Sequence, residues 1–132
     1  MYLVDTDTLS NLTKRRPSRR LVRHLGAVHG AIYTSAITVA ELVRGAHKTD
    51  RAAILLERID ALVDDLDGVL PFDALAARIC GRIAAGLERR GSRLDFADLQ
   101  IAAITLHNDC TLITHNRRHF ERVPGLAVDD WL

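Results

Sequence analysis

The sequence predicts an α/β fold in which helices cover both faces of a mostly parallel central sheet of four to five strands. Two observations support this prediction. Short apolar runs alternate with longer segments of helical periodicity along nearly the whole chain. Residues typical of helix starts and stops, such as Thr38, Asp73 and Gly91, divide these segments. We expect residues 1–132 to form one domain, because this length is typical of a single globular unit.

The predicted strands are short and apolar. They cover residues 2–4, 31–34, 69–70 and 111–114, and a fifth is expected at residues 126–128, after the turn at Pro124 and Gly125. Strands of this kind are buried on both faces, which is typical of a parallel sheet between helical layers. In such folds the functional groups gather at the carboxyl ends of the strands.

The predicted helices cover residues 7–14, 17–25, 38–47, 50–66 and 73–90, and a last helix starts near Phe96. In the fourth of them, Leu55, Ile59, Leu62 and Leu66 are spaced by three or four residues and form one apolar stripe. The last helix carries apolar residues on two sides, so we expect it to lie buried between layers.

Composition favours a globular protein inside the cell. Apolar residues make up 48% of the chain and charged residues 27%, which argues against a disordered or fibrous protein. Cys80 and Cys110 lack metal-binding or redox spacing, so we expect buried thiols in a reducing compartment. No apolar run is long enough to cross a membrane, and the N-terminus lacks the features of a signal peptide. We therefore expect a cytoplasmic protein without membrane contact.

Three acidic residues stand where this fold exposes chemistry. Asp5 closes the first strand, Glu41 lies in the first turn of the helix after the second strand, and Asp98 lies in the first turn of the buried helix. Parallel strands would bring all three to one edge of the sheet. Carboxylate oxygens prefer Mg²⁺ or Mn²⁺ to zinc, and clustered carboxylates repel one another unless a cation is bound. The pattern favours a magnesium site.

Two of these acids also have a purely structural interpretation. Thr38 and Glu41 match the capping-box spacing, which needs no metal. Asp95 is a candidate cap for the buried helix, and Asp98 would then occupy the third position, where an anion suits the helix dipole. Asp5 is harder to explain in this way, because strand ends are where such folds keep their sites. The three residues together favour metal binding.

Polar residues also follow the fourth strand. Thr114 and Asn116 are expected to reach the same edge. There Asn116 either hydrogen-bonds a metal-bound water or a phosphate oxygen, or is an ordinary turn residue. His115 and His119 have a spacing found in zinc sites. Because no third ligand stands at a recognisable spacing, we do not predict zinc.

A basic cluster lies near the N-terminus. Residues 1–48 contain eight Lys/Arg and three Asp/Glu, whereas residues 49–75 contain two and seven. The excess is concentrated in Lys14, Arg15, Arg16, Arg19, Arg20 and Arg23. A solvated helix face is the plainer explanation of such a cluster. Beside a catalytic site, however, it favours contact with a phosphate backbone.

Four segments resemble the motifs of PIN-domain toxins of the VapC type. They are residues 2–10 (YLVDTDTLS), 35–42 (SAITVAEL), 97–103 (ADLQIAA) and 112–116 (LITHN), the last followed by Phe120, Val123, Gly125, Leu126 and Trp131. The resemblance runs nearly end to end, in the family's order and spacing. It implies a PIN-domain-like α/β/α sandwich.

The resemblance also implies a metal-dependent endoribonuclease, the toxin of a type II toxin–antitoxin pair. Asp5, Glu41 and Asp98 would bind the metal and act in catalysis with Asn116, which stands where the family often has a fourth acid. Thr114 and the arginines would contact the RNA substrate, namely Arg15, Arg16, Arg19 and Arg20. The family further implies a homodimer, and a cognate antitoxin whose tail occupies a groove beside the active site. The segment 93–96 differs from the family's usual Pro-Ile-rich lead-in.

Two alternatives remain open at this point. Asp5-Thr6-Asp7 after an apolar strand also resembles the opening of haloacid-dehalogenase-like phosphatases, in which Asp5 would be a covalent nucleophile. That family needs a later lysine and an acidic pair, which this chain lacks at suitable positions. The other alternative is a non-catalytic PIN domain that binds RNA or a protein partner.

Overall fold

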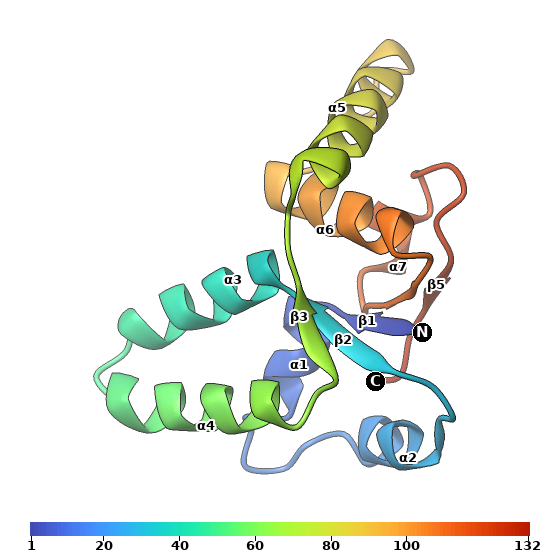
Figure 1. The fold of residues 1–132 in the computed structure, drawn as a ribbon. Coiled ribbons are helices and arrows are strands. Elements are labelled where there is room, and N and C mark those ends of the chain that lie inside the picture. The colour runs from blue at the N-terminus through green and yellow to red at the C-terminus, as the bar shows by residue number, and fades with distance from the viewer.

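The centre of the computed structural model, which describes residues 1–132, is a parallel sheet of five strands in the order β3-β2-β1-β4-β5. The strands are β1 (Tyr2–Val4), β2 (Ile32–Ser35), β3 (Gly68–Leu70), β4 (Thr111–Ile113) and β5 (Val128–Asp129). The predicted fold class is confirmed, and the sheet is parallel throughout. β1 lies in the middle, so the residue that follows it is flanked by the ends of both β2 and β4 (Figure 1).

The helices are α1 (Thr6–Asn11), α2 (Arg19–Ala27), α3 (Ala36–His47), α4 (Ala52–Asp64), α5 (Ala74–Arg89), α6 (Phe96–His107) and α7 (Arg117–Phe120). The first helix ends earlier than predicted, because Leu12, Thr13 and Lys14 form tighter turns in which each amide donates to the carbonyl three residues before it. The short helix α7 was not predicted, since four residues are too few for a periodic pattern.

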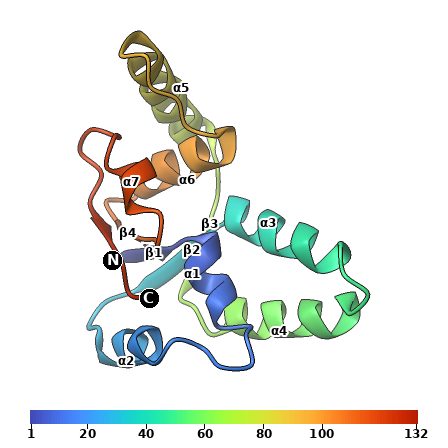
Figure 2. The ribbon, with the colours of Figure 1, turned by 180° about the vertical axis from the view of Figure 1, so that it is seen from behind.

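Side-chain alternation along the strands divides the core into two layers. Leu3 and Leu112 pack on one face of the sheet with α5, α6 and α7. Val4 and Ile113, the next residue in each strand, pack on the other face with α1, α2, α3, α4 and Trp131. Both faces of the sheet are therefore covered by helices, as Figures 1 and 2 show from opposite sides.

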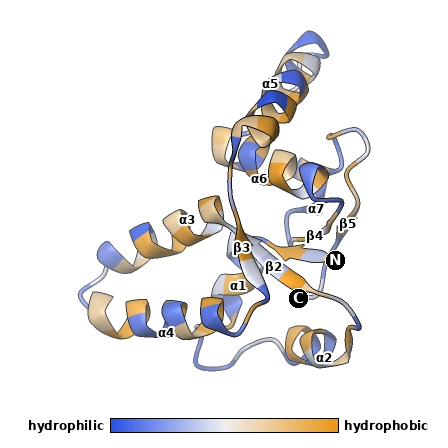
Figure 3. Ribbon diagram, viewed as in Figure 1, coloured by the Kyte–Doolittle hydropathy of each residue, from blue (hydrophilic) through white to orange (hydrophobic).

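Two helical units project from this body. Helices α3 and α4 lie side by side and extend away from the sheet as a pair, while α5 extends in a different direction (Figure 2). In Figure 3 these helices carry hydrophilic and hydrophobic residues along their length, as expected for helices that bury only one side. None of the helices combines the length and the apolar composition needed to cross a membrane.

Candidate active site

Asp5 lies at the carboxyl end of the central strand and is buried, with 4% of its surface exposed. Its Oδ1 atom caps α1 by accepting from the backbone amides of Asp7, at 3.1 Å, and Thr8, at 3.4 Å. Val4 is paired with Ile113 in the sheet, so the next residue of each strand also meets its neighbour. At this position the Thr114 hydroxyl donates to Oδ2 of Asp5 over 2.6 Å.

Burial raises the pKa of Asp5 to about 6. The hydrogen bonds from Thr114 and Thr8 lower the pKa, but they do not offset the loss of water around the carboxylate. The negative charges of Asp7 and Asp98 raise it further. The fold therefore holds a carboxylate where its charge is unfavourable without a nearby cation.

Glu41 reaches the site from α3, but its position in the helix and its hydrogen-bond partner differ from the prediction. Helix α3 is capped by Ser35, whose hydroxyl accepts from the Thr38 amide at 3.0 Å, so the helix begins one turn before the predicted cap. Glu41 is therefore in the second turn, and the capping-box interpretation is wrong. Its Oε1 atom instead accepts a 2.6 Å hydrogen bond from the Thr6 hydroxyl of α1.

Asp98 occupies the third position of α6, as predicted. Asp95 stands at the cap position, but its side chain makes no capping hydrogen bond. Burial is the main reason why the pKa of Asp98 is raised, followed by the negative charge of Asp95, with smaller contributions from Glu41 and Asp7. His119 has the opposite effect, with its Nδ1 atom 3.8 Å from Oδ2 of Asp98.

Asp7 joins these residues although the sequence did not single it out as a site residue. It lies exposed in the first turn of α1, where its Oδ2 atom accepts a 2.9 Å hydrogen bond from the Asn116 side-chain amide. The Asn116 backbone amide donates to the Thr114 hydroxyl at 3.1 Å. Asn116 thus reaches the predicted edge of the sheet and links β4 to α1. The Asp5-Thr6-Asp7 sequence was the available signal, since both Thr6 and Asp7 belong to the site.

These acids share one electrostatic region, because Asp98 raises the pKa of Asp5 and Asp7 raises the pKa of both. No three of them lie close enough together to hold an ion by themselves. The donors nevertheless fit Mg²⁺, which prefers carboxylate oxygens, usually uses one or two carboxylates and keeps several of its waters.

The two histidines of the possible zinc spacing diverge. His115 pairs with Asp130, at 3.0 Å between Nδ1 and Oδ2, whereas His119 lies beside Asp98. No group of three His, Cys, Asp or Glu side chains in the structure could hold zinc.

The basic cluster does not join the carboxylates. Arg15 and Arg16 are exposed in the turn between α1 and α2, and Arg19 and Arg20 open α2. Arg20 donates to the backbone carbonyl of Leu132 at 2.8 Å.

Helix α2 is held near the amino end of β1. Its His24 ring stacks on Trp131, with centroids 5.3 Å apart, and Trp131 also packs against Tyr2 at the start of β1. Figure 2 shows α2 beside the two chain ends. Two other exposed arginines, Arg117 and Arg118, lie in α7, the first helix after β4. The sequence analysis did not identify them as candidate RNA contacts.

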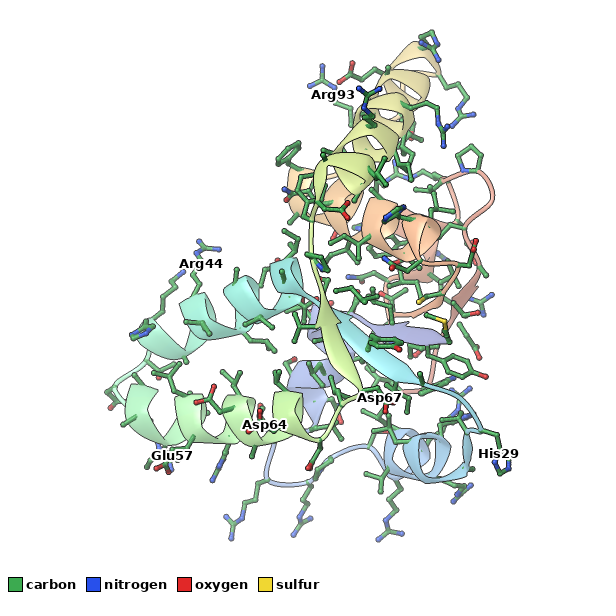
Figure 4. All side chains as sticks on the ribbon, viewed as in Figure 1. His29, Arg44, Glu57, Asp64, Asp67 and Arg93 are labelled. Carbon is green, nitrogen blue, oxygen red and sulfur yellow. The ribbon has the colours of Figure 1, made fainter.

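A groove continues from Glu41 and Thr6 between α1, α3 and α4. It has a volume of about 260 Å³ and is lined by Thr6, Ser10, Thr13, Glu41, Leu42, Gly45, Ala46, Leu55 and Ile59. Charged side chains such as Arg44 of α3 and Glu57 of α4 point outward, away from the facing sides of the two helices (Figure 4). The groove is therefore mainly apolar and opens at the carboxylate site.

A family model described as the PIN domain matches residues 2–126. The chain is 33% identical over 130 residues to a Shigella flexneri protein named tRNA(fMet)-specific endonuclease VapC, covering 98% of this chain and 97% of that protein. It is also 33% identical over 134 residues to Ribonuclease VapC2 of Haemophilus influenzae, covering 99% and 98%.

Solved structures give the same assignment. VapBC2 from Rickettsia felis, bound to a DNA fragment from its promoter, superposes with a TM-score of 0.92 at 25% identity and covers 99% of this chain and 98% of that chain. DNA-bound VapBC from Salmonella typhimurium superposes with a TM-score of 0.91 at 29% identity and the same coverage. The chain belongs to the PIN-domain family and is a VapC-type member of it.

Proposed function

We propose that this protein is a Mg²⁺-dependent endoribonuclease and the toxin of a toxin–antitoxin pair. The observation that carries the proposal is the buried Asp5 carboxylate at the end of the central strand, destabilised in its charged form and electrostatically coupled to Asp98. The names of its relatives as ribonucleases and endonucleases support the same activity. A buried carboxylate whose pKa is raised, with further acids near it, is best explained by a bound cation.

Asp5 and Asp98 would hold the ion, and Glu41 would hold it or orient a water. Mg²⁺ or Mn²⁺, as one ion or two, would supply an activated water and neutralise charge at the phosphate. The chain's own residues set the positions of these groups. Thr114 fixes one oxygen of Asp5, and Thr6 fixes one oxygen of Glu41. The Asn116 side-chain amide donates to Asp7, and its second hydrogen would be available to a phosphate oxygen.

RNA would bind across the rim of the sheet. Arg117 and Arg118 follow β4 and suit phosphates near the cleaved bond, whereas Arg15, Arg16, Arg19 and Arg20 suit the RNA backbone farther away. Contacts of this type make binding strongly dependent on salt concentration. The Shigella flexneri relative is named as specific for tRNA(fMet), so structured RNA with exposed loops is the first substrate to test.

A cognate antitoxin is the second expected partner. Several structural neighbours are VapBC complexes. The apolar groove between α3 and α4 suits an apolar antitoxin segment, and Glu41 and Thr6 at its end place such a segment beside the carboxylates. Occupation of the groove would therefore block the site. The homodimer and the cytoplasmic location remain predictions.

Neither alternative function is favoured. The match to the PIN family speaks against a dehalogenase-like phosphatase with Asp5 as nucleophile, and Asp5 is buried and already bonded to Thr114 and to the α1 amides. A non-catalytic role is disfavoured because Asp5, Glu41 and Asp98 are all present and the relatives are named as nucleases.

The test is cleavage of total cellular RNA by purified, antitoxin-free protein in Mg²⁺. Discrete fragments are expected, and they should disappear with a chelator and with Asp98→Asn. The exposed Asp60→Asn variant on α4 is the matched control and should cleave normally. Intact RNA from folded protein, across several metals and salt concentrations, would refute the proposal. A phosphoaspartate at Asp5 would instead support the phosphatase.

A further inference from the structure

The Phe96 side chain is more exposed than its contribution to the hydrophobic core would require. It is the first residue of α6, two positions before Asp98, and 67% of its surface is exposed, more than any other large apolar side chain. A phenyl ring left in water contributes little to the hydrophobic core.

The ring borders a hollow of about 370 Å³, a volume within the range of small-molecule sites. Its walls come from α5, from the segment that connects α5 to α6, and from α6 itself, and they are formed by Ala84, Leu87, Glu88, Ser92, Arg93, Leu94, Phe96 and Leu99. Leu87 and Leu99 are buried and form an apolar floor. Glu88, Ser92 and Arg93 supply polar groups above it.

Two guanidinium groups flank the hollow. Arg93 lies alongside α5, as Figure 4 shows, and no acidic side chain lies within ion-pair distance of it. Arg122 reaches the hollow from the segment after α7, where it donates to the Ser92 hydroxyl at 2.8 Å. These arginines have no acidic partner and lie beside an exposed aromatic ring, near acids proposed to cleave phosphodiesters, which favours a nucleic-acid occupant.

We propose that this hollow binds an unpaired nucleobase of the RNA, stacked on Phe96, with an adjoining phosphate against Arg93. The inference rests on the proposed ribonuclease function. Glu88 accepts hydrogen bonds only, so its side of the hollow suits a base edge that offers an amino group. An apolar protein segment is less suited to this hollow, because it would leave the Arg93 guanidinium without an ionic partner.

Binding is measured with single-stranded RNA twelve-mers that carry one 2-aminopurine, whose fluorescence falls when it stacks. The Asp98→Asn protein is used so that the RNA stays intact. Phe96→Tyr keeps the ring and should bind as the parent does. Phe96→Leu and Phe96→Ala should lose the fluorescence change and bind roughly five- to 150-fold more weakly, the loss expected for one stacked base. Leu75→Ala, exposed on α5 outside the hollow, is the control and should bind normally.

The second measurement is RNA cleavage by Phe96 variants that keep Asp98. Phe96→Leu should raise KM and change the preferred cleavage positions, while Phe96→Tyr should restore both. Equal binding and cleavage by all three Phe96 variants would overturn the base site and leave the nuclease intact. A change of oligomeric mass or antitoxin affinity in Phe96→Ala, with RNA binding unchanged, would assign the ring to a protein interface instead. If the parent neither binds nor cleaves RNA, the proposed function fails first, and this inference fails with it.

Discussion

The Thr114 hydroxyl donates to Oδ2 of Asp5 over 2.6 Å, although 109 positions separate the two residues in the sequence. Thr114 also accepts from the Asn116 amide, so a single side chain joins the ends of β1 and β4 to the start of α7. Because the hydrogen bond goes to a carboxylate, it matters for both stability and charge at the site.

Replacement of Thr114 by Val keeps the shape of the side chain and removes this donor. We expect the free energy of unfolding at pH 7.5 to fall by about 1.5–3 kcal/mol, the usual contribution of a hydrogen bond to a charged group. Urea unfolding measures the loss, and Thr114→Ser, which keeps the hydroxyl, serves as the control. In an Asp5→Asn background the loss should be smaller. Equal stability of the Val and Ser variants would contradict the proposed importance of this bond.

The pKa of Asp5 predicts how stability depends on pH when metal is absent. The folded-state pKa is about 6 and the ordinary value is 3.8, so between these values the folded protein binds more protons than the unfolded chain. Stability contributed by Asp5 is thus complete below pH 3.8 and is lost as the pH rises through 6. The loss is on the order of 3 kcal/mol.

The measurement is urea unfolding of the parent and of Asp5→Asn in a chelator, between pH 4 and pH 7.5. We expect the variant to gain stability relative to the parent as the pH rises, because its amide keeps the helix cap without the charge. If the difference in unfolding free energy between parent and variant does not vary with pH, burial does not raise the pKa of Asp5.

Mg²⁺ should stabilise the folded protein, since an ion that binds only the native state raises its stability by mass action. We expect the melting temperature of the parent to rise with Mg²⁺ and to return to its starting value with a chelator. The rise should be absent in Asp5→Asn with Asp98→Asn, and unchanged in Asp60→Asn. An equal rise in the double variant would place the ion elsewhere.

Gly45 offers a test of the groove that leaves the fold intact. A Cβ atom at Gly45 meets nothing within 4 Å, and Gly45 lines the groove between α3 and α4. Gly45→Gln should therefore weaken antitoxin binding at least tenfold by calorimetry, about 1.4 kcal/mol, while RNA cleavage persists. Gly81→Gln is the matched control, because Gly81 is also open but lies on α5. Unchanged affinity of Gly45→Gln would move the antitoxin to another surface.

Much of the fold was predictable because its signals are local. The apolar runs mark β1, β2, β3 and β4, and the stripe through Leu55 and Ile59 marks α4. Helix starts were less certain, because Ser35 and Thr38 are both good caps three residues apart. The choice between them depends on where β2 ends, and β2 extends one residue farther than its apolar run suggests.

The site was predictable in part for the same reason. Residues at strand ends, such as Asp5 and Thr114, could be placed on one edge from the parallel topology alone. The hydrogen-bond partner of Glu41 could not be predicted, because its bond to Thr6 depends on how α1 and α3 pack. The position of α2 depends on Trp131, more than 100 residues away, so no local pattern could separate the basic cluster from the carboxylates.

The order of the strands has a consequence for synthesis of the protein on the ribosome. β1 (Tyr2–Val4) is made long before its neighbour β4 (Thr111–Ile113). Until residue 114 has left the exit tunnel, Asp5 lacks its partner Thr114 and the helix that carries Asp98 cannot pack against β4. A nascent chain that stops before β4 therefore carries no assembled site, because the partners of Asp5 and of α6 are still missing.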